Sequence, residues 1–276
     1  MTHTRKLEDL PMTTFYRYTI RTYLILRYAF HWLSRTGCFG RHQPVFFTPG
    51  FRERSGSTLS AGLFRHHVKQ FHESSCSVAS VVSVVNTLRE KVSGVRTRPV
   101  TQAEILDKVR AEHWKERMGP DGHKGRRGLP LAVLGRVVRA SLEAYEIPGA
   151  RVEVIQAGSG RKGRKIRHKV IRYLKDFHTR DNCILIAHFD QGSFVRELNI
   201  PHISPVGGFD PDTGTVTVLD VDPSQPRPYK IPFHTFYRGI STHYGGVFRP
   251  FEYGRGGVVV IHIPHEKENI EATQSH

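Results

Sequence analysis

Two residues near one another in the sequence have the chemistry of a covalent catalyst. Cys76 begins the valine-rich stretch CSVASVVSVVNTL, and Gln70 lies six residues before it. Val78, Val82 and Val85 recur at helical spacing, which predicts a buried helix from about residue 76 to 90. The free N–H groups at a helix start favour a thiolate, the nucleophilic form of cysteine. The Gln70 amide and the Cys76 backbone N–H could then stabilise the oxyanion of a tetrahedral intermediate.

A histidine and an aspartate are expected to meet on a β-hairpin. The segments HISPVGGF and TVTVLDVD flank the turn DPDTG. A turn centred near Asp212 places His202 opposite about Asp222 and makes Asp220 its diagonal neighbour on the same face. A carboxylate bound to one imidazole nitrogen fixes the tautomer and leaves the other nitrogen free as a base. Counting residues does not decide between Asp220 and Asp222.

A structural interpretation competes with this chemistry. A free cysteine is often a small buried apolar residue, so Cys76 could simply begin a helix in the core. Most of the 17 histidines must also be structural or exposed. The order glutamine, cysteine at a helix, histidine on a strand and aspartate on the next strand favours catalysis. Papain-like cysteine enzymes use this arrangement, and papain itself has asparagine in place of the aspartate.

The remaining pattern predicts helices first and strands afterwards. Thr101 and Glu104 have the spacing of a capping box, which starts a second helix. Further helices are expected over 131–145 and 166–177, and strands over 182–189 and 256–263. Helices followed by strands indicate an α+β fold rather than an alternating, doubly wound one.

Charge and cysteine content restrict the partners and the compartment. The net charge of +16 attracts polyanions, anionic membrane surfaces and small acidic substrates, and does not choose among them. The basic cluster GSGRKGRKIRHK (158–169) is predicted to be a solvated loop entering a helix, with phosphate or nucleic-acid contact as the alternative. Three cysteines without a CxxC pair fit a reducing compartment, which predicts a cytoplasmic protein.

The N-terminal 45 residues are interpreted as an extension, followed by a catalytic domain over 46–264 and a frayed tail over 265–276. The hydrophobic stretch 14–33 is interrupted by Arg17, Arg21 and Arg27, so it is too polar to span a bilayer. We expect a basic helix that packs on the domain, or alternatively lies on a membrane surface as a peripheral contact. Whether two copies form a homodimer is left open.

Four segments resemble the phytochelatin synthase family of papain-like enzymes. They are KQFHESSCSVASVVSVVNTL, DNCILIAHFDQGSFVRE, PHISPVGGFDPDTGTVTVLDVD and YGRGGVVVIHI, and the His–Ser–Pro–x–Gly–Gly run is the most specific. The resemblance implies a papain-like cysteine protease fold, in which a helical N-terminal lobe packs its nucleophile helix on a C-terminal antiparallel sheet. Several features depart from the family pattern, among them Ser77 in place of a glycine and a poor match over residues 92–180.

The same resemblance implies a role for each candidate residue. Cys76 is the nucleophile, His202 the general base and acid, and Gln70 the oxyanion donor. The eighteen-residue step from His202 matches Asp220 to the orienting carboxylate, and Arg255 matches the arginine that holds the γ-glutamyl carboxylate.

The implied reaction cleaves the Cys–Gly amide of glutathione through a γ-Glu-Cys acyl-enzyme, without a cofactor for acylation. The acyl group passes to water or to a second glutathione whose thiolate binds a heavy-metal ion such as cadmium or zinc. The alternatives are a papain-like peptidase for another peptide, or a basic protein that binds a membrane or, less expectedly, nucleic acid.

Overall fold

The fold is built around one antiparallel sheet. The computed structural model describes residues 10–40, 43–48, 57–244 and 252–264, with side chains from residue 18 onward. Seven strands in this part of the chain form the order β1-β6-β5-β4-β3-β7-β2. They are β1 (Val45–Phe46), β2 (Arg151–Gln156), β3 (Cys183–Asp190), β4 (Pro201–Asp210), β5 (Thr215–Val218), β6 (Tyr229–Pro232) and β7 (Gly257–His262). All of the neighbouring pairs are antiparallel, so the structure has the α+β class that the sequence predicted.

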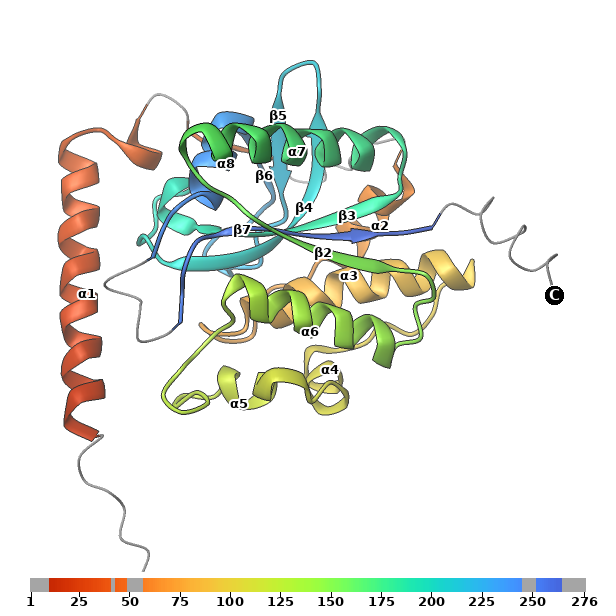
Figure 1. Cartoon of the computed structure of the whole chain (residues 1–276), viewed down its shortest axis with the longest axis horizontal. Coiled ribbons are helices and arrows are strands. Elements are labelled where there is room, and N and C mark those ends of the chain that lie inside the picture. The colour runs from red at the N-terminus through yellow and green to blue at the C-terminus, as the bar shows by residue number, and fades with distance from the viewer. Residues whose placement is uncertain (1–9, 41–42, 49–56, 245–251, 265–276) are drawn as a thin grey trace, which may run out of the picture.

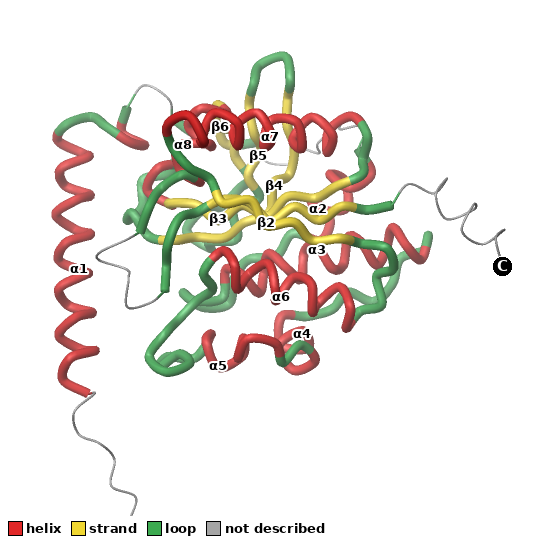
Figure 2. Tube along the Cα trace, in the orientation of Figure 1, coloured by secondary structure: helices red, strands yellow, loops and turns green. Residues whose placement is uncertain are grey.

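Helices cover both faces of this sheet, and one helix stands apart at its end (Figure 1). They are α1 (Leu10–Leu33), α2 (Thr58–His66), α3 (Cys76–Ser93), α4 (Gln102–Lys108), α5 (Trp114–Met118), α6 (Leu131–Ala144), α7 (Gly160–Thr179) and α8 (Phe233–Ile240). Short 3-10 turns are η1 (Gly37–Phe39), η2 (Ala111–His113) and η3 (Gln191–Ser193). Figures 1 and 2 show α7 and α8 on one side of the sheet, with α3 to α6 on the other.

The helix predicted from about residue 76 to 90 is confirmed as α3. Every residue from Cys76 to Leu88 is buried, so the helix is enclosed by the core on all sides. This burial outweighs the preference of its valines for strands. The helix ends at Gly94, whose left-handed φ of 66° lets its N–H bond to Glu90 O.

The capping box at Thr101 and Glu104 is also present and starts α4. Helix α6 and strands β3 and β7 match the elements expected over 131–145, 182–189 and 256–263.

The hairpin forms with one irregularity. Strands β4 and β5 pair Phe209 with Val216, and the register shifts between Gly208 and Val206, which pairs with Val218. Beyond the shift, the register is the one expected from a turn near Asp212. The shift adds a residue to one strand. Such a bulge bends the strand pair and changes the direction of the end beyond it. That end carries His202 at the start of β4, with Asp220 just after β5.

Two expectations need comment. The basic cluster over 158–169 was predicted as a loop entering a helix at about residue 166, whereas α7 begins earlier, at Gly160, and includes most of the cluster. The predicted tail over 265–276 lies outside the described residues, as do residues 1–9 and 41–42 of the N-terminal extension.

Candidate active site

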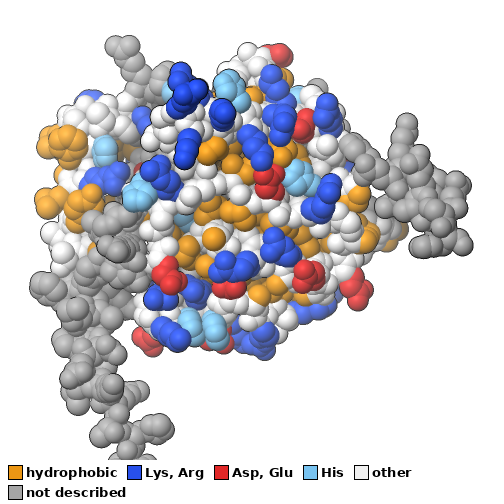
Figure 3. Space-filling view, viewed as in Figure 1, with side chains coloured by type: hydrophobic (Ala, Val, Ile, Leu, Met, Phe, Trp, Pro, Cys, Tyr) orange, Lys and Arg blue, Asp and Glu red, His pale blue; other side chains and the backbone are white. Residues whose placement is uncertain are grey.

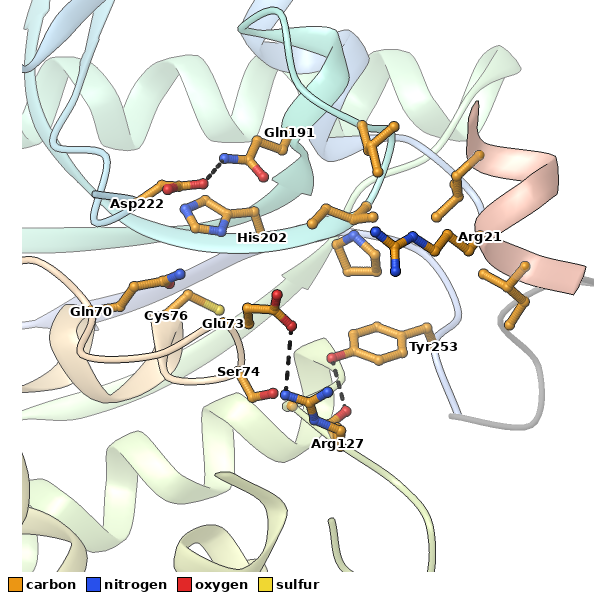
Figure 4. A pocket seen from close by; sticks show the side chains of 16 residues that line it. Arg21, Gln70, Glu73, Ser74, Cys76, Arg127, Gln191, His202, Asp222 and Tyr253 are labelled. Carbon is orange, nitrogen blue, oxygen red and sulfur yellow. Dashed lines mark hydrogen bonds and ion pairs between the residues drawn. The ribbon is translucent and has the colours of Figure 1, made fainter. Parts of the chain in front are cut away.

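A cavity of about 550 Å³ lies where α3, β4 and α1 meet, and three of the predicted catalytic residues line it. They are Cys76, His202 and Gln70 (Figure 4). Figure 4 shows the Cys76 sulfur, the His202 ring and the Gln70 amide nitrogen directed toward a common space. Segments more than 100 residues apart in sequence therefore bring a thiol, an imidazole and an amide together.

Cys76 is the cysteine placed for chemistry. It is the first residue of α3 and keeps 8% of its surface exposed in the cavity. The other two cysteines lie away from the cavity. Burial raises the pKa of the Cys38 thiol to about 11 and that of Cys183 to about 12, so both remain thiols at neutral pH.

His202 is fixed by a buried carboxylate. Its Nε2 lies 2.8 Å from Asp220 Oδ1, and Tyr229 Oη donates to Asp220 Oδ2 over 2.8 Å. Burial by itself lowers the pKa of His202, but the Asp220 charge and hydrogen bond, together with Cys76, outweigh it and raise that pKa to about 10. Burial raises the pKa of Asp220, yet His202 and the other donors hold it below its usual value. The pair therefore favours an imidazolium beside Cys76.

Ser80 links the two halves of this site. Its hydroxyl lies 2.8 Å from Cys76 O in the preceding helical turn and 3.0 Å from Ile203 O, next to His202 on β4. The hydroxyl is fully buried, so each contact replaces one that water would otherwise provide. This bridge sets the start of α3 against the strand that carries the His202 imidazole.

The loop that carries Gln70 is held against the same strands. Gln70 N donates to Val221 O over 2.8 Å, directly after Asp220. Lys69 Nζ donates to the carbonyl oxygens of Asp220 and Gln225, each over 2.6 Å. The loop that carries Gln70 is thus tied to the backbone around Asp220.

The comparisons with known proteins agree with this geometry. A scan against protein-family models matches residues 53–245 to phytochelatin synthase, which is more than half of the chain and contains Gln70, Cys76, His202 and Asp220. The chain belongs to the phytochelatin synthase family. Membership supports a glutathione-related transpeptidase function in general. A search of the curated proteins found no match.

This phytochelatin synthase family member has two other histidines near the site whose ring nitrogens are buried. Burial lowers the pKa of His67 and His188 to about 4, with Lys69 adding to the effect at His67. Both rings stay neutral at pH 7, and neither lines the cavity. Among these three buried rings, His202 is the one held as a cation.

The serine after the nucleophile has a packing role in this family member. Ser77 Oγ accepts a hydrogen bond from Trp114 Nε1 over 3.0 Å, and both residues are fully buried. A glycine would leave the indole N–H without this acceptor, which is costly in a core. Ser77 therefore provides the hydrogen-bond acceptor that the buried indole N–H of Trp114, in α5, requires.

Several cavity residues had no signal in the sequence. Gln191 Nε2 donates to Asp222 Oδ2 over 2.5 Å, so the aspartate set aside as the orienter lies in the cavity wall instead. Arg127 and Tyr253 line the opposite side, and Arg21 enters from α1 (Figure 4). Only the folded chain brings these loops together, so local spacing could not reveal them.

Arg255 lies outside the family match and is not among the residues that line this cavity. Its backbone forms a bridge with His243, and its Nη1 would lie 3.8 Å from a Cβ placed on Gly158. In this conformation the guanidinium is directed toward the loop before α7. The role of Arg255 as a carboxylate clamp therefore stays a prediction.

The described residues contain no group of three or more histidine, cysteine, aspartate or glutamate side chains that could hold a metal ion. Any metal in the reaction is treated below as part of a substrate.

Proposed function

We propose that this chain is a cysteine-nucleophile acyltransferase with a papain-like arrangement, which cleaves the Cys–Gly amide of glutathione. The observation that carries the proposal is the Cys76–His202–Asp220 constellation at one cavity of a phytochelatin synthase family chain. Glutathione is a small anionic peptide, so the cationic chain and the two arginines in the cavity also suit it.

In the proposed first step, the Cys76 thiolate attacks the carbonyl carbon between cysteine and glycine. The carbonyl oxygen becomes an oxyanion that the Gln70 amide and the Cys76 backbone N–H stabilise. The C–N bond then breaks, and the His202 imidazolium gives its proton to the leaving amine of glycine. A γ-Glu-Cys thioester on Cys76 remains, and Asp220 keeps the ring oriented throughout.

In the second step, neutral His202 takes a proton from the acceptor as the acceptor attacks the thioester. A second glutathione, whose thiol is bound to cadmium or zinc as a thiolate, gives a longer γ-Glu-Cys peptide through its amino group. Water instead gives free γ-Glu-Cys. In both cases the thioester C–S bond breaks and the Cys76 thiolate is restored.

Incubation with glutathione, followed by intact-protein mass spectrometry and product analysis, tests this function. We expect a γ-Glu-Cys adduct on the protein, release of glycine, and either free or lengthened γ-Glu-Cys peptide. Repeating the reaction with cadmium separates the two acceptors, because only transfer should increase with the metal thiolate. Absence of both the adduct and glycine release would contradict the proposal and direct the search to other peptides and amides.

The carboxylates of glutathione should be bound by Arg127 in the cavity wall and, as the family resemblance implies, by Arg255. Arg127 lines the cavity, and its ion pair with Glu73 is weak because the two groups are 3.9 Å apart and Glu73 is 92% exposed. We expect Arg127→Gln and Arg255→Gln each to raise the KM for glutathione by about tenfold or more, as loss of a charged hydrogen bond would. The KM for glutathione diethyl ester, which lacks both carboxylates, should change much less.

Arg126→Gln is the matched control for this comparison. Arg126 adjoins Arg127 and pairs with Glu252 over 2.5 Å, but it does not line the cavity. Its KM should stay within about twofold, as for other surface pairs. If Arg255→Gln behaves like this control, the clamp assignment of Arg255 is wrong. If Arg127→Gln changes the KM for glutathione and for its diethyl ester equally, Arg127 does not bind a carboxylate of glutathione.

A further inference from the structure

The most conspicuous feature outside the catalytic machinery is the outward face of α1. We define this face as Tyr18, Tyr23, Ile25, Leu26, Phe30, Trp32 and Leu33, all of which are exposed. Seven of the twelve exposed large hydrophobic residues in the described part of the chain belong to it. Between Thr22 and Leu33, every exposed residue is uncharged. Such a continuous apolar surface marks a site of association rather than ordinary solvent contact.

The other side of α1 is fixed to the protein. Ile20 and Leu24 are buried and line the catalytic cavity, and Tyr28 packs edge-on against Phe39 with the ring centroids 5.3 Å apart. Tyr18, Ile25 and Trp32 follow one another at seven-residue steps on the side away from these contacts. The helix therefore presents one apolar stripe to the core and a second, wider one to its surroundings.

Cations border this outward face without interrupting it. Arg35 is exposed just beyond the end of the helix, whereas Arg21, although exposed, lines the cavity on the other side. Helix α7 begins at the end of the molecule where α1 stands, and its exposed residues are mainly basic (Figures 1 and 3). They include Arg161, Lys162, Arg164, Lys165, Arg167, Arg172 and Lys175, whereas Asp176 is the one acidic residue of α7.

Figure 3 shows hydrophobic side chains gathered on the α1 side of the molecule and Lys and Arg side chains over α7. Tyrosine, tryptophan and phenylalanine beside basic residues are typical of helices that lie in a membrane interface. Within the described residues, no helix combines the length and apolar character that crossing a bilayer requires. The geometry points to a helix lying along a surface.

We propose that the outward face of α1 docks on an anionic lipid surface. A second copy of the chain fits less well, because each copy has a net charge of +16 and the two would repel one another. An anionic bilayer supplies both an apolar layer for the aromatic residues and the negative charge that complements the flanking cations. Because the cavity lies behind the opposite side of α1, docking leaves the catalytic groups away from the lipid.

Flotation of the full chain with phospholipid vesicles tests this proposal. We expect the protein to float with vesicles of phosphatidylcholine mixed with phosphatidylserine, to bind less to phosphatidylcholine alone, and to dissociate as salt screens the charges. The double variant Leu26→Glu, Phe30→Glu should bind the mixed vesicles at least about tenfold less, because two apolar contacts become anionic.

Val95→Glu is the matched control. Val95 and Leu26 are 64% and 65% exposed, but Val95 follows α3 and is not part of the outward face. This variant should bind like the wild type, and far-ultraviolet circular dichroism should show that all variants are folded. The proposal is overturned if the wild type fails to float with mixed vesicles at low salt, if the double variant binds as well as the wild type, or if Val95→Glu loses as much binding.

Light scattering tests the alternative that a second copy of the chain covers the outward face. The proposal expects the same mass for the wild type and the Leu26→Glu, Phe30→Glu variant in vesicle-free buffer. A wild-type dimer that the double variant converts to monomer would overturn it in favour of a second copy. Because no readout here depends on glutathione turnover, failure of lipid binding and failure of the proposed enzymatic function are separate results.

Discussion

Cys76→Ser should abolish the acyl-enzyme and lower glutathione turnover by about 10⁴-fold or more, as removal of a catalytic nucleophile does. The serine hydroxyl is not ionised at neutral pH, so the imidazolium of His202 would have no anionic nucleophile beside it. Serine keeps the size and polarity needed at the start of α3, so the fold should survive. Intact-protein mass spectrometry after mixing with glutathione measures the adduct, and thermal unfolding checks the fold.

The other two cysteines provide internal controls. Cys38→Ser and Cys183→Ser should each retain the adduct, because their thiols lie outside the cavity and burial raises their pKa. Any loss of stability in these variants would come from burying a hydroxyl. A near-normal rate for Cys76→Ser would disprove the nucleophile assignment. Loss of the adduct in Cys38→Ser or Cys183→Ser, with the adduct kept in Cys76→Ser, would also disprove it.

The elements predicted correctly are those with a strong local pattern. Helix α3 has the 3–4 spacing of its valines, and α4 has its capping box. Strand β2 was missed because it is an edge strand with mostly accessible residues, and its partner β7 lies about 100 residues later, with Val154 opposite Val259. Pairing over such a separation leaves no local signature.

The start of α7 was predicted as a loop because glycines and charges usually interrupt structure. Gly163 is nevertheless required for close packing, since a Cβ there would lie 2.2 Å from Gly158 O. Tyr237 Oη donates to both Gly158 O and Gly163 O, over 3.0 and 2.7 Å, and joins the helix start to α8. A residue that signals a break in sequence is here a contact between two segments.

The candidate site also contains some residues that the sequence could predict and others that it could not. The hairpin predicted that His202 would lie near Asp220 or Asp222, and the eighteen-residue step of the family resemblance selected Asp220, which lies just after β5 and 2.8 Å from His202. The cavity wall formed by Arg21, Arg127 and Gln191 was not predictable, because these residues come from segments that meet only through packing. Sequence therefore indicated the candidate reacting groups, whereas the residues that line the cavity around them required the structure.

His202→Ala should lower turnover by about 10²–10⁴-fold at neutral pH, the usual contribution of a general acid–base group. The imidazole serves both as the acid that protonates glycine and as the base for the acceptor, so both steps should slow. A loss of less than about tenfold would place the acid and base elsewhere. Single-turnover glycine release measures the first step, and breakdown of the adduct measures the second.

The pH profile gives this prediction its sharpest form, with Asp220→Asn as the companion variant. The Asp220 charge helps raise the pKa of His202 to about 10, so the imidazolium of the wild type should persist above the ordinary value of about 6.5 and decline only as pH rises through the raised one. Asparagine keeps the shape but removes the charge. Burial then lowers the pKa of His202 with only Cys76 left to oppose it, so the alkaline loss of acylation should move to lower pH. Identical alkaline limbs in the two proteins would show that another group, and not the His202–Asp220 pair, holds the proton that glycine receives.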